Sequence, residues 1–322
     1  MGRFAFPDGK RFAFTIVDDT DVATVENVRP IYRLLEEVGM RTTKTVWPVG
    51  YSEGRSAFSS SETLENAEYR DFLVDLKRRG FELTWHAATM ESSLRERTVA
   101  GLARFREVFG EYPRIHVSHA NNRENLYWGA DRIDDRVLRR LMGSVWGWKA
   151  GYFQGHVEGS PYWWGDLCAR HIVYARNLTF NQINTAAVNR SIPYRDKARP
   201  LAEWWFSSSD ADDAAAFAEL LRPENQERLE REGGVCIVAT HIGKRFYDGN
   251  RIHPLVEERI RMLARRPGWF VPVGQLLDWL REQRDDEFLP AAEWRWMQWR
   301  WAIDSAIRFA RSHLSARRRA TK

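Results

Sequence analysis

Carboxylates and imidazoles directly follow several apolar runs of this chain. Three carboxylates within four positions follow the first run, and a histidine follows each of three later runs: Asp18, Asp19, Asp21, His86, His119 and His241. Neighbouring carboxylates can divide metal binding and proton transfer between them. A carboxylate with two imidazoles also suits Zn²⁺ or a similar divalent ion, with positions left for water. The residue types therefore predict metal-assisted acid–base chemistry. The alternative is an Asp-rich turn that caps a helix, with histidines that are structural.

The elements that must position these residues are predicted from hydrophobic periodicity. The apolar runs before them are predicted strands, and further strands are expected later in the chain: residues 11–17, 42–47, 81–85, 114–118, 171–180, 200–206, 235–239 and 269–273. Amphipathic stretches between them predict helices, as at 61–79 and 254–265. Alternating strands and helices give parallel strands with right-handed crossovers. If such a sheet closes, its strand ends converge on one mouth, so we expect an α/β barrel with the site there.

Length, composition and net charge limit the classes of protein to which this chain can belong. The 322 residues suffice for one large barrel or two ordinary domains. Met1 to Phe4 lack the apolar core of a secretion signal, and Cys168 and Cys236 form no CxxC pair, so a reducing cytoplasm is expected. The net charge of +5 admits an anionic partner. No nucleic-acid recognition motif accompanies that charge, so we expect no nucleic-acid partner.

Three short motifs resemble those of a known family. Val17-Asp18-Asp19, His86 after Thr84-Trp85, and Thr240-His241 resemble the first, second and last motifs of the polysaccharide deacetylase (NodB-homology) family. The resemblance covers roughly residues 11–280. It implies a partly open (β/α)7-type barrel, here with an extra C-terminal helix. It also implies an enzyme that removes acetyl groups from N-acetylated sugars with a divalent metal.

The resemblance assigns roles to four residues. Asp18 matches the catalytic base, Asp19 the metal-binding carboxylate, His86 the first metal histidine, and His241 the general acid. The chain departs from the family where Met90 stands at the second metal histidine. Residues 116–122 also replace the family's arginine motif. From its placement we predict that His119 supplies the missing ligand, with His116 next in line.

Other polar and aromatic residues near the strand ends are candidates for contact with a carbohydrate substrate: Asn121, Asn122, Glu124, Trp164 and Asp166. Turn formation, aromatic packing and helix capping are their structural alternatives. Lys244 and Arg245 could meet an anionic substrate or lie in a solvated loop.

The first hypothesis is a metal-dependent hydrolase, with Zn²⁺ as the expected metal, that acts on an N-acetylated sugar or glycan precursor. The alternative is a catalytically inactive barrel that binds a glycan or a partner protein, which the Met90 substitution favours. Metal content separates the two hypotheses.

The C-terminal segment predicts an amphipathic helix. We divide the chain into a barrel domain, 1–286, and a basic and aromatic helix with its tail, 287–322. Trp296, Trp299 and Ile303 recur at helical spacing beside several arginines. This stripe could pack on the barrel or on a second subunit, and the oligomeric state stays open. It could instead bind an anionic membrane surface through residues 290–315.

Overall fold

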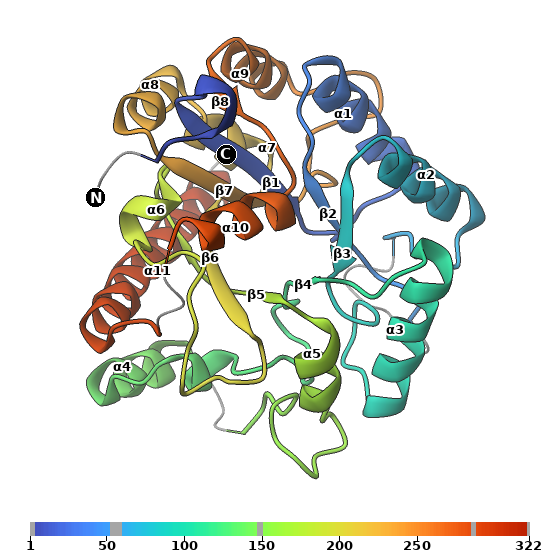
Figure 1. Cartoon of the computed structure of the whole chain (residues 1–322), viewed down its shortest axis with the longest axis vertical. Coiled ribbons are helices and arrows are strands. Elements are labelled where there is room, and N and C mark those ends of the chain that lie inside the picture. Colours follow the sequence, from blue (N-terminus) through green and yellow to red (C-terminus); the bar gives the residue numbers. More distant parts are fainter. Residues whose placement is uncertain (1–3, 52–59, 147–150, 285–287, 321–322) are drawn as a thin grey trace.

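The computed structural model describes residues 4–51, 60–146, 151–284 and 288–320, the side chains of 144–146 and 309–320 excepted. Parallel strands occupy the centre of this part of the chain (Figure 1). Their bounds are β1 Phe12–Asp18, β2 Thr43–Val46, β3 Glu82–Trp85, β4 Ile115–His116, β5 Tyr174–Phe180, β6 Trp204–Asp210, β7 Val235–Thr240 and β8 Gly268–Trp269.

Strands β1 to β7 follow one another around a ring, and β1 pairs with both β7 and β2. Some of the ladders are short: two residue pairs join β1 to β2, and one pair, Trp85 with His116, joins β3 to β4. Strand β8 pairs in parallel with the start of β1, at Phe12 and Ala13. The (β/α)7-type barrel with an extra C-terminal helix, predicted from the sequence, is confirmed.

Helices surround the ring (Figure 1). Their bounds are α1 Val25–Glu37, α2 Ala67–Arg78, α3 Arg95–Phe109, α4 Arg136–Trp146, α5 Gly165–His171, α6 Thr185–Val188, α7 Ala214–Leu220, α8 Pro223–Glu232, α9 Pro254–Ala264, α10 Val273–Glu282 and α11 Ala291–Ala320, with short 3₁₀ turns at Pro7–Gly9 and Gly129–Arg132. None of the described helices is both long enough and apolar enough to cross a membrane.

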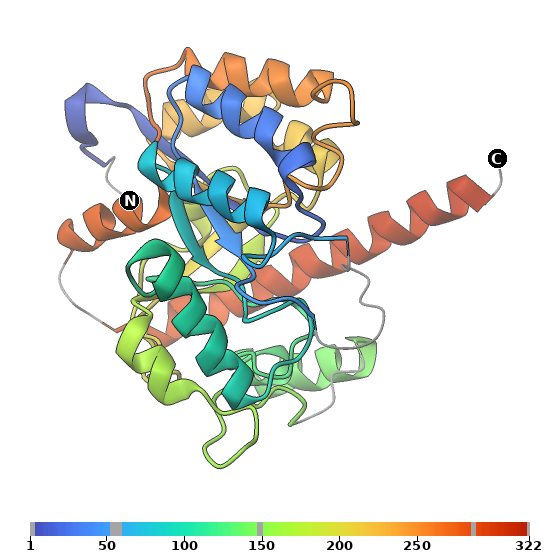
Figure 2. The ribbon, with the colours of Figure 1, turned by 90° about the vertical axis from the view of Figure 1, so that its right-hand side faces the viewer.

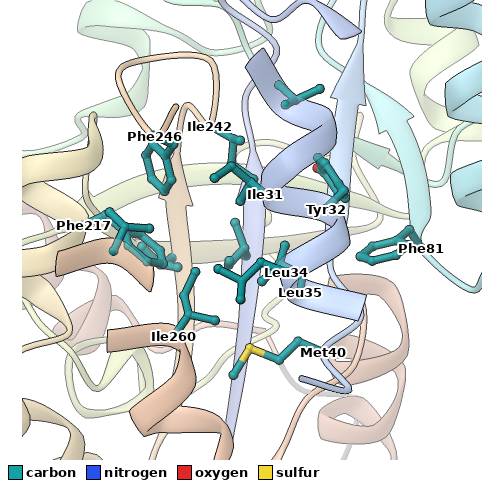
Figure 3. Packing of buried hydrophobic residues seen from close by; sticks show 14 of the residues in the cluster. Ile31, Tyr32, Leu34, Leu35, Met40, Phe81, Phe217, Ile242, Phe246 and Ile260 are labelled. Carbon is teal, nitrogen blue, oxygen red and sulfur yellow. The ribbon is translucent and has the colours of Figure 1, made fainter. Parts of the chain in front are cut away.

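Strand β1 shows how the barrel sorts its side chains. Phe14 and Ile16 belong to the core between the sheet and its helices, where Ile31 and Leu35 of α1 also lie (Figure 3). Val17 instead belongs to the core inside the ring. Successive strand residues point to opposite faces. The last residue of the strand, Asp18, is therefore on the helix-facing side.

Helix α10 lies across one end of the ring (Figure 1). Its residues Val273, Leu276 and Leu280 join the apolar core inside the barrel. Its first turn is held by strand residues, since the backbone N–H of Val273 donates to Thr43 at 2.8 Å and that of Gly274 to Glu82 at 2.9 Å. The carboxyl ends of the strands open at the other end of the barrel, where the sequence predicts the site.

Helix α11 packs on the barrel with one face. Trp294, Met297 and Trp301 are buried in an apolar cluster with residues of β5 and α4. Trp296 and Ile303 are exposed on the helix. The C-terminal end of α11 extends beyond the rest of the molecule (Figure 2). The predicted boundary at 286 and 287 and the side chains of the basic tail lie outside the described residues, so the division into two units stays a proposal.

Candidate active site

A cavity of 380 Å³ opens at the carboxyl ends of the strands. Its lining combines acids, histidines and cations: Asp19, Asp21, His86, His119, Arg132, Arg176, Asp210, Asp212, His241, Lys244 and Arg308. Most of these residues come from segments that follow β1, β3, β4, β6 and β7. The barrel therefore gathers side chains that are more than 200 residues apart in sequence.

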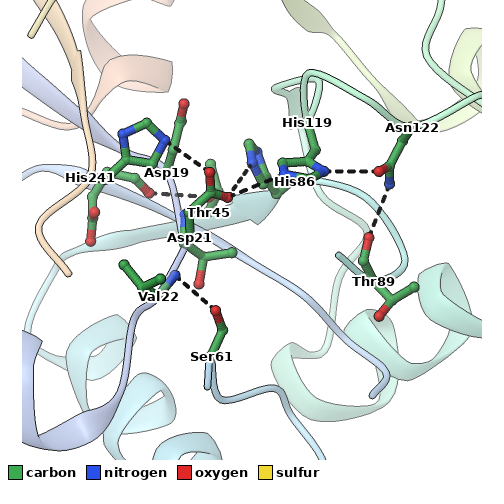
Figure 4. A network of polar contacts seen from close by, with 12 residues as sticks. Asp19, Asp21, Val22, Thr45, Ser61, His86, Thr89, His119, Asn122 and His241 are labelled. Atoms are coloured by element: carbon green, nitrogen blue, oxygen red, sulfur yellow. Dashed lines mark hydrogen bonds and ion pairs between the residues drawn. The ribbon is translucent and has the colours of Figure 1, made fainter. Parts of the chain in front are cut away.

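Asp21 lies at the centre of three histidines (Figure 4). Its Oδ1 lies 3.3 Å from Nε2 of His86 and 3.7 Å from Nε2 of His119. Its Oδ2 lies 3.1 Å from Nε2 of His241. Burial alone would raise the pKa of Asp21, but hydrogen bonds from His241 and His86 hold that pKa well below its usual value. Asp21 is thus an ionised carboxylate with imidazoles on both oxygens.

The protonation of the His119 ring follows from its neighbour Asn122 (Figure 4). The Asn122 amide nitrogen donates to the backbone oxygens of Thr89 at 3.1 Å and Glu91 at 3.0 Å, so its oxygen must accept. That oxygen lies 2.9 Å from Nδ1 of His119, which is therefore the protonated nitrogen. Nε2 then turns a lone pair toward Asp21. Burial and the neighbouring His86 lower the pKa of His119, which keeps the ring neutral.

An apolar floor holds the two imidazoles. Trp47 is buried with Met90 in a small cluster of their own. The Trp47 ring lies 5.7 Å from the ring of His86 and 5.6 Å from that of His119, measured between centroids. Met90, which stands where the family has a metal histidine, therefore packs beneath the site.

His241 is held between two carboxylates. Its Nε2 faces Asp21, and its Nδ1 lies 3.0 Å from Oδ1 of Asp212. Burial opposes protonation, but these two hydrogen bonds outweigh it and raise the pKa of His241 to about 10. Lys244 donates to the same Asp212 carboxylate at 3.0 Å. Both ring nitrogens thus have fixed partners, and the ring is a cation in the neutral pH range.

Asp18 lies away from this cluster, contrary to the expectation that it faces His241. Its carboxylate is fully buried and accepts from Lys44 at 2.8 Å, from the Tyr32 hydroxyl at 2.9 Å and from the backbone N–H of Ile242 at 2.8 Å. All of its described partners lie outside the cavity lining. The reason is the period of the strand, which turns position 18 toward the helices.

Asp19 lies in the cavity lining but is paired with a cation. Arg176 of β5 binds both of its oxygens, at 3.1 and 2.6 Å. Burial alone would raise the pKa of Asp19. The Arg176 guanidinium and the nearby histidines outweigh burial, so the pKa of Asp19 is lowered. Within the acidic run, the carboxylate that contacts the histidines directly is that of Asp21, the third of the run.

Of the predicted substrate contacts, Asn121 alone is in the cavity lining that the described residues form. Asn122 and Glu124 are buried behind His119, and the Asn122 amide donates to Oε1 of Glu124 at 2.9 Å. Burial raises the pKa of Glu124 to about 7. The Trp164 ring is buried beside His116, and its N–H donates to the Glu124 backbone at 2.7 Å.

The two remaining sequence candidates also lie outside the lining. Asp166 binds Arg95 through both oxygens, each at 2.7 Å. His116 hydrogen-bonds Ser118 at 3.1 Å, and burial lowers its pKa to about 3. Between the two candidate ligands, His119 is the one that the structure brings to Asp21 and His86.

The sequence named Asp21 in the acidic run but gave it no role, and it did not single out Arg176 or Asp212. For Asp21 a usable signal existed, since the alternation within β1 turns Asp18 away from the barrel. Arg176 could have been read in the same way, because Tyr174, two positions before it in β5, belongs to the core inside the ring. The sequence predicts a strand at 200–206, whereas β6 runs Trp204–Asp210. Asp212 therefore did not stand out as a residue that follows a strand end.

The donors around Asp21 fit a divalent ion in type. Oδ1 of Asp21 and Nε2 of His86 face each other at 3.3 Å, and otherwise these two atoms and Nδ1 of His86 are buried with no hydrogen-bond partner among the described residues. Unsatisfied buried polar atoms are rare and require an explanation, such as an ion. Two imidazoles and a carboxylate are also a common ligand set for zinc. Within the described ranges, no three His, Cys, Asp or Glu side chains already meet as a metal-binding cluster.

No protein-family model matches the sequence, and neither does any curated protein. Solved structures do share its fold. A candidate polysaccharide deacetylase from Mycobacterium smegmatis has a TM-score of 0.51 at 14% identity, over 90% of this chain and 98% of its own. A second candidate, from Pseudomonas aeruginosa PAO1, has 0.52 at 12% identity, over 88% and 95%.

A differently named enzyme also has this fold. Puue allantoinase has a TM-score of 0.50 at 12% identity, over 86% of this chain and 93% of its own. The chain therefore has the barrel of these proteins over most of its length. At such identities the likeness establishes the fold, and the function must be argued from the site.

Proposed function

We propose that this protein is a divergent member of the polysaccharide deacetylase family that removes an acetyl group from an N-acetylated sugar. The observation that carries the proposal is the Asp212–His241–Asp21 chain facing His86 and His119 in one cavity. It places a proton donor opposite a set of suitable metal ligands. Amide hydrolysis needs both functions, a donor for the leaving amine and an activated water.

His241 is the proposed general acid. Its cationic ring has Nε2 in the cavity, while Asp212 holds Nδ1 and fixes the orientation of the ring. As the C–N bond breaks, Nε2 gives its proton to the leaving amine. Asp212 and Asp21 make the imidazolium available without a large movement of the side chain.

Asp19 is the proposed proton acceptor in place of Asp18. Its carboxylate is ionised, lies in the cavity lining and is oriented by the two hydrogen bonds from Arg176. An oriented carboxylate can bind the attacking water and take its proton. The guanidinium lowers the basicity of Asp19 but fixes its position.

Asp21, His86 and His119 would hold the metal, for which Zn²⁺ is the proposal. When bound there, such an ion supplies Lewis acidity to the acetyl carbonyl and lowers the pKa of a water. Asn122 acts through His119, because it keeps the Nε2 lone pair of that ring directed to the site.

A cytoplasmic glycan precursor is the proposed substrate. The described cysteines, Cys168 and Cys236, are buried free thiols, which accords with a reducing compartment. Fractionation of native cells tests the location, and recovery of the protein outside the cell would contradict it.

The alternative function is an inactive barrel that binds a glycan or a partner protein. It is supported by Met90, which is buried in one cluster with Trp47 and stands where the family has a metal-binding histidine. Such a protein would bind sugars without releasing acetate, whether or not metal was supplied.

Acetate release tests the proposal. The purified protein is assayed on N-acetylated sugars, sugar phosphates and nucleotide sugars, before and after removal of metal with a chelator. We expect release that falls to background on chelation and returns when Zn²⁺ is restored, because the water and the carbonyl both need the ion. Circular dichroism of the chelated protein controls for unfolding. Acetate release that stays unchanged after the metal has been removed would contradict metal dependence.

We also propose that α11 contacts an anionic membrane surface through its exposed apolar side chains, among them Trp296 and Ile303. Aromatic and basic residues on one helix suit such a surface. Full-length protein should co-sediment with anionic vesicles at low salt, and a Trp296→Ala, Ile303→Ala double variant should not. Leu255→Ala, an exposed leucine on α9, is the matched control. Wild-type protein that does not co-sediment with such vesicles would contradict this proposal.

A further inference from the structure

The cations that line the cavity differ in how their charge is balanced. Arg176 binds Asp19, and Lys244 binds Asp212. Arg308 lies 3.4 Å from a carboxylate oxygen of Asp210. Arg132 is the exception, since among the described residues no ion pair of Arg132 is found and no carboxylate is among the groups that shift its pKa most.

Arg132 is nevertheless buried, with 6% of its surface exposed. Its Nη2 donates to the backbone oxygen of Asn177 at 2.9 Å, and its Nε is buried without a hydrogen-bond partner. Burial, together with the nearby Arg176, lowers the pKa of the Arg132 guanidinium to about 9, so the group is still charged near neutral pH. Buried charges are normally paired, because desolvation without a partner is costly.

The surroundings of Arg132 hold the guanidinium in place without neutralising it. The ring of Trp128 stacks on it with 3.6 Å between the guanidinium carbon and the ring centroid. The Trp301 ring of α11 lies 5.4 Å away by the same measure. Aromatic faces stabilise a cation but carry no net charge, and a stacked guanidinium keeps its N–H edge for a planar oxyanion.

The cavity joins this cation to the proposed reaction centre. Arg132 lines the same 380 Å³ space as Asp21 and His241. Cavities of this size hold small-molecule ligands. A bound molecule can therefore reach the histidines with one part and Arg132 with another.

We propose that Arg132 binds an oxyanion of the substrate, so that the substrate is a sugar derivative carrying a phosphate or a carboxylate. This inference rests on the proposed function for the reaction, but the anion site itself rests on a buried guanidinium for which the described part of the chain supplies no carboxylate. Arg–oxyanion pairs are frequently bidentate and bind both groups well. The oxyanion supplies the counter-charge that no described carboxylate provides at this position.

Binding measurements test the proposal without relying on acetate release. Calorimetric titration compares N-acetylglucosamine with its 1-phosphate and with N-acetylmuramic acid, whose carboxylate distinguishes the two kinds of oxyanion. Wild-type protein should bind at least one charged sugar about 10- to 100-fold more tightly than the neutral one, the usual worth of a hydrogen bond to a charged group. Arg132→Gln should remove that preference.

Two further variants keep the outcome interpretable. Arg136→Gln removes an equal charge from an exposed position of α4 outside the cavity lining, and it should keep the preference. Arg132→Lys keeps the charge without the planar fork and should retain part of the preference if Arg132→Gln fails to fold. Wild-type protein with equal affinity for charged and neutral sugars would overturn the proposal, as would an Arg132→Gln variant that keeps the preference. An Arg132-dependent preference without any acetate release would retain the anion site and contradict only the proposed reaction.

Discussion

Replacing His241 by alanine is expected to lower the turnover number about 10²–10⁴-fold, the usual worth of a positioned acid. In the proposed reaction no other described group stands between two carboxylates with a nitrogen in the cavity. The leaving amine would therefore depart without a donor. Acetate release under saturating substrate measures the effect.

The control for this variant is His171→Ala. His171 stacks on Tyr112 at 3.7 Å between ring centroids and does not line the cavity, so turnover should be unchanged. Metal content of the His241 variant should match that of wild-type protein, because His241 is not a proposed ligand. A His241→Ala variant with full turnover would rule out the assigned role.

Asp18→Asn is expected to destabilise the protein by about 3–5 kcal/mol, the usual cost of breaking a buried ion pair by removing one partner. Asp18 and Lys44 are both fully buried, and the substitution leaves the ammonium without a counter-charge. The free energy of unfolding from denaturant titration measures the loss. The Asp18→Asn protein that remains folded should keep the wild-type turnover number, because Asp18 lies outside the cavity lining.

Glu68→Gln is the matched control, since it breaks the exposed ion pair with Arg29 and should cost less than about 1 kcal/mol. The opposite pattern, with unchanged stability and lost turnover in Asp18→Asn, would restore Asp18 as the catalytic base that the family motif implies.

The barrel and the convergence of its strand ends could be predicted from the sequence, because hydrophobic period and strand–helix alternation are local signals. His86, His119 and His241 follow strands, so their meeting at one mouth depends only on the sheet closing. The choice among Asp18, Asp19 and Asp21 was harder. A motif match places a residue in the chain, but the period of the strand decides which face its side chain occupies.

Arg132 could not have been found in the same way. It lies in a 3₁₀ turn within an irregular stretch of the chain, Gly129–Arg132, where no periodicity indicates the direction of a side chain. Its charge matters because no described carboxylate pairs with it, and that can be seen only once the fold has placed the carboxylates. The buried face of α11 depended likewise on tertiary packing, although its helical spacing was readable.

The metal content of purified Asp21→Asn protein tests whether Asp21 is a metal ligand. Wild-type protein and Asp18→Asn, both supplied with Zn²⁺ and then freed of loosely bound ion, serve as references. We expect near-stoichiometric metal in both references and loss of most of it in Asp21→Asn, because Asp21 contributes the carboxylate between His86 and His119. Full metal content in Asp21→Asn, or wild-type protein that retains none, would contradict a metal site at Asp21, His86 and His119.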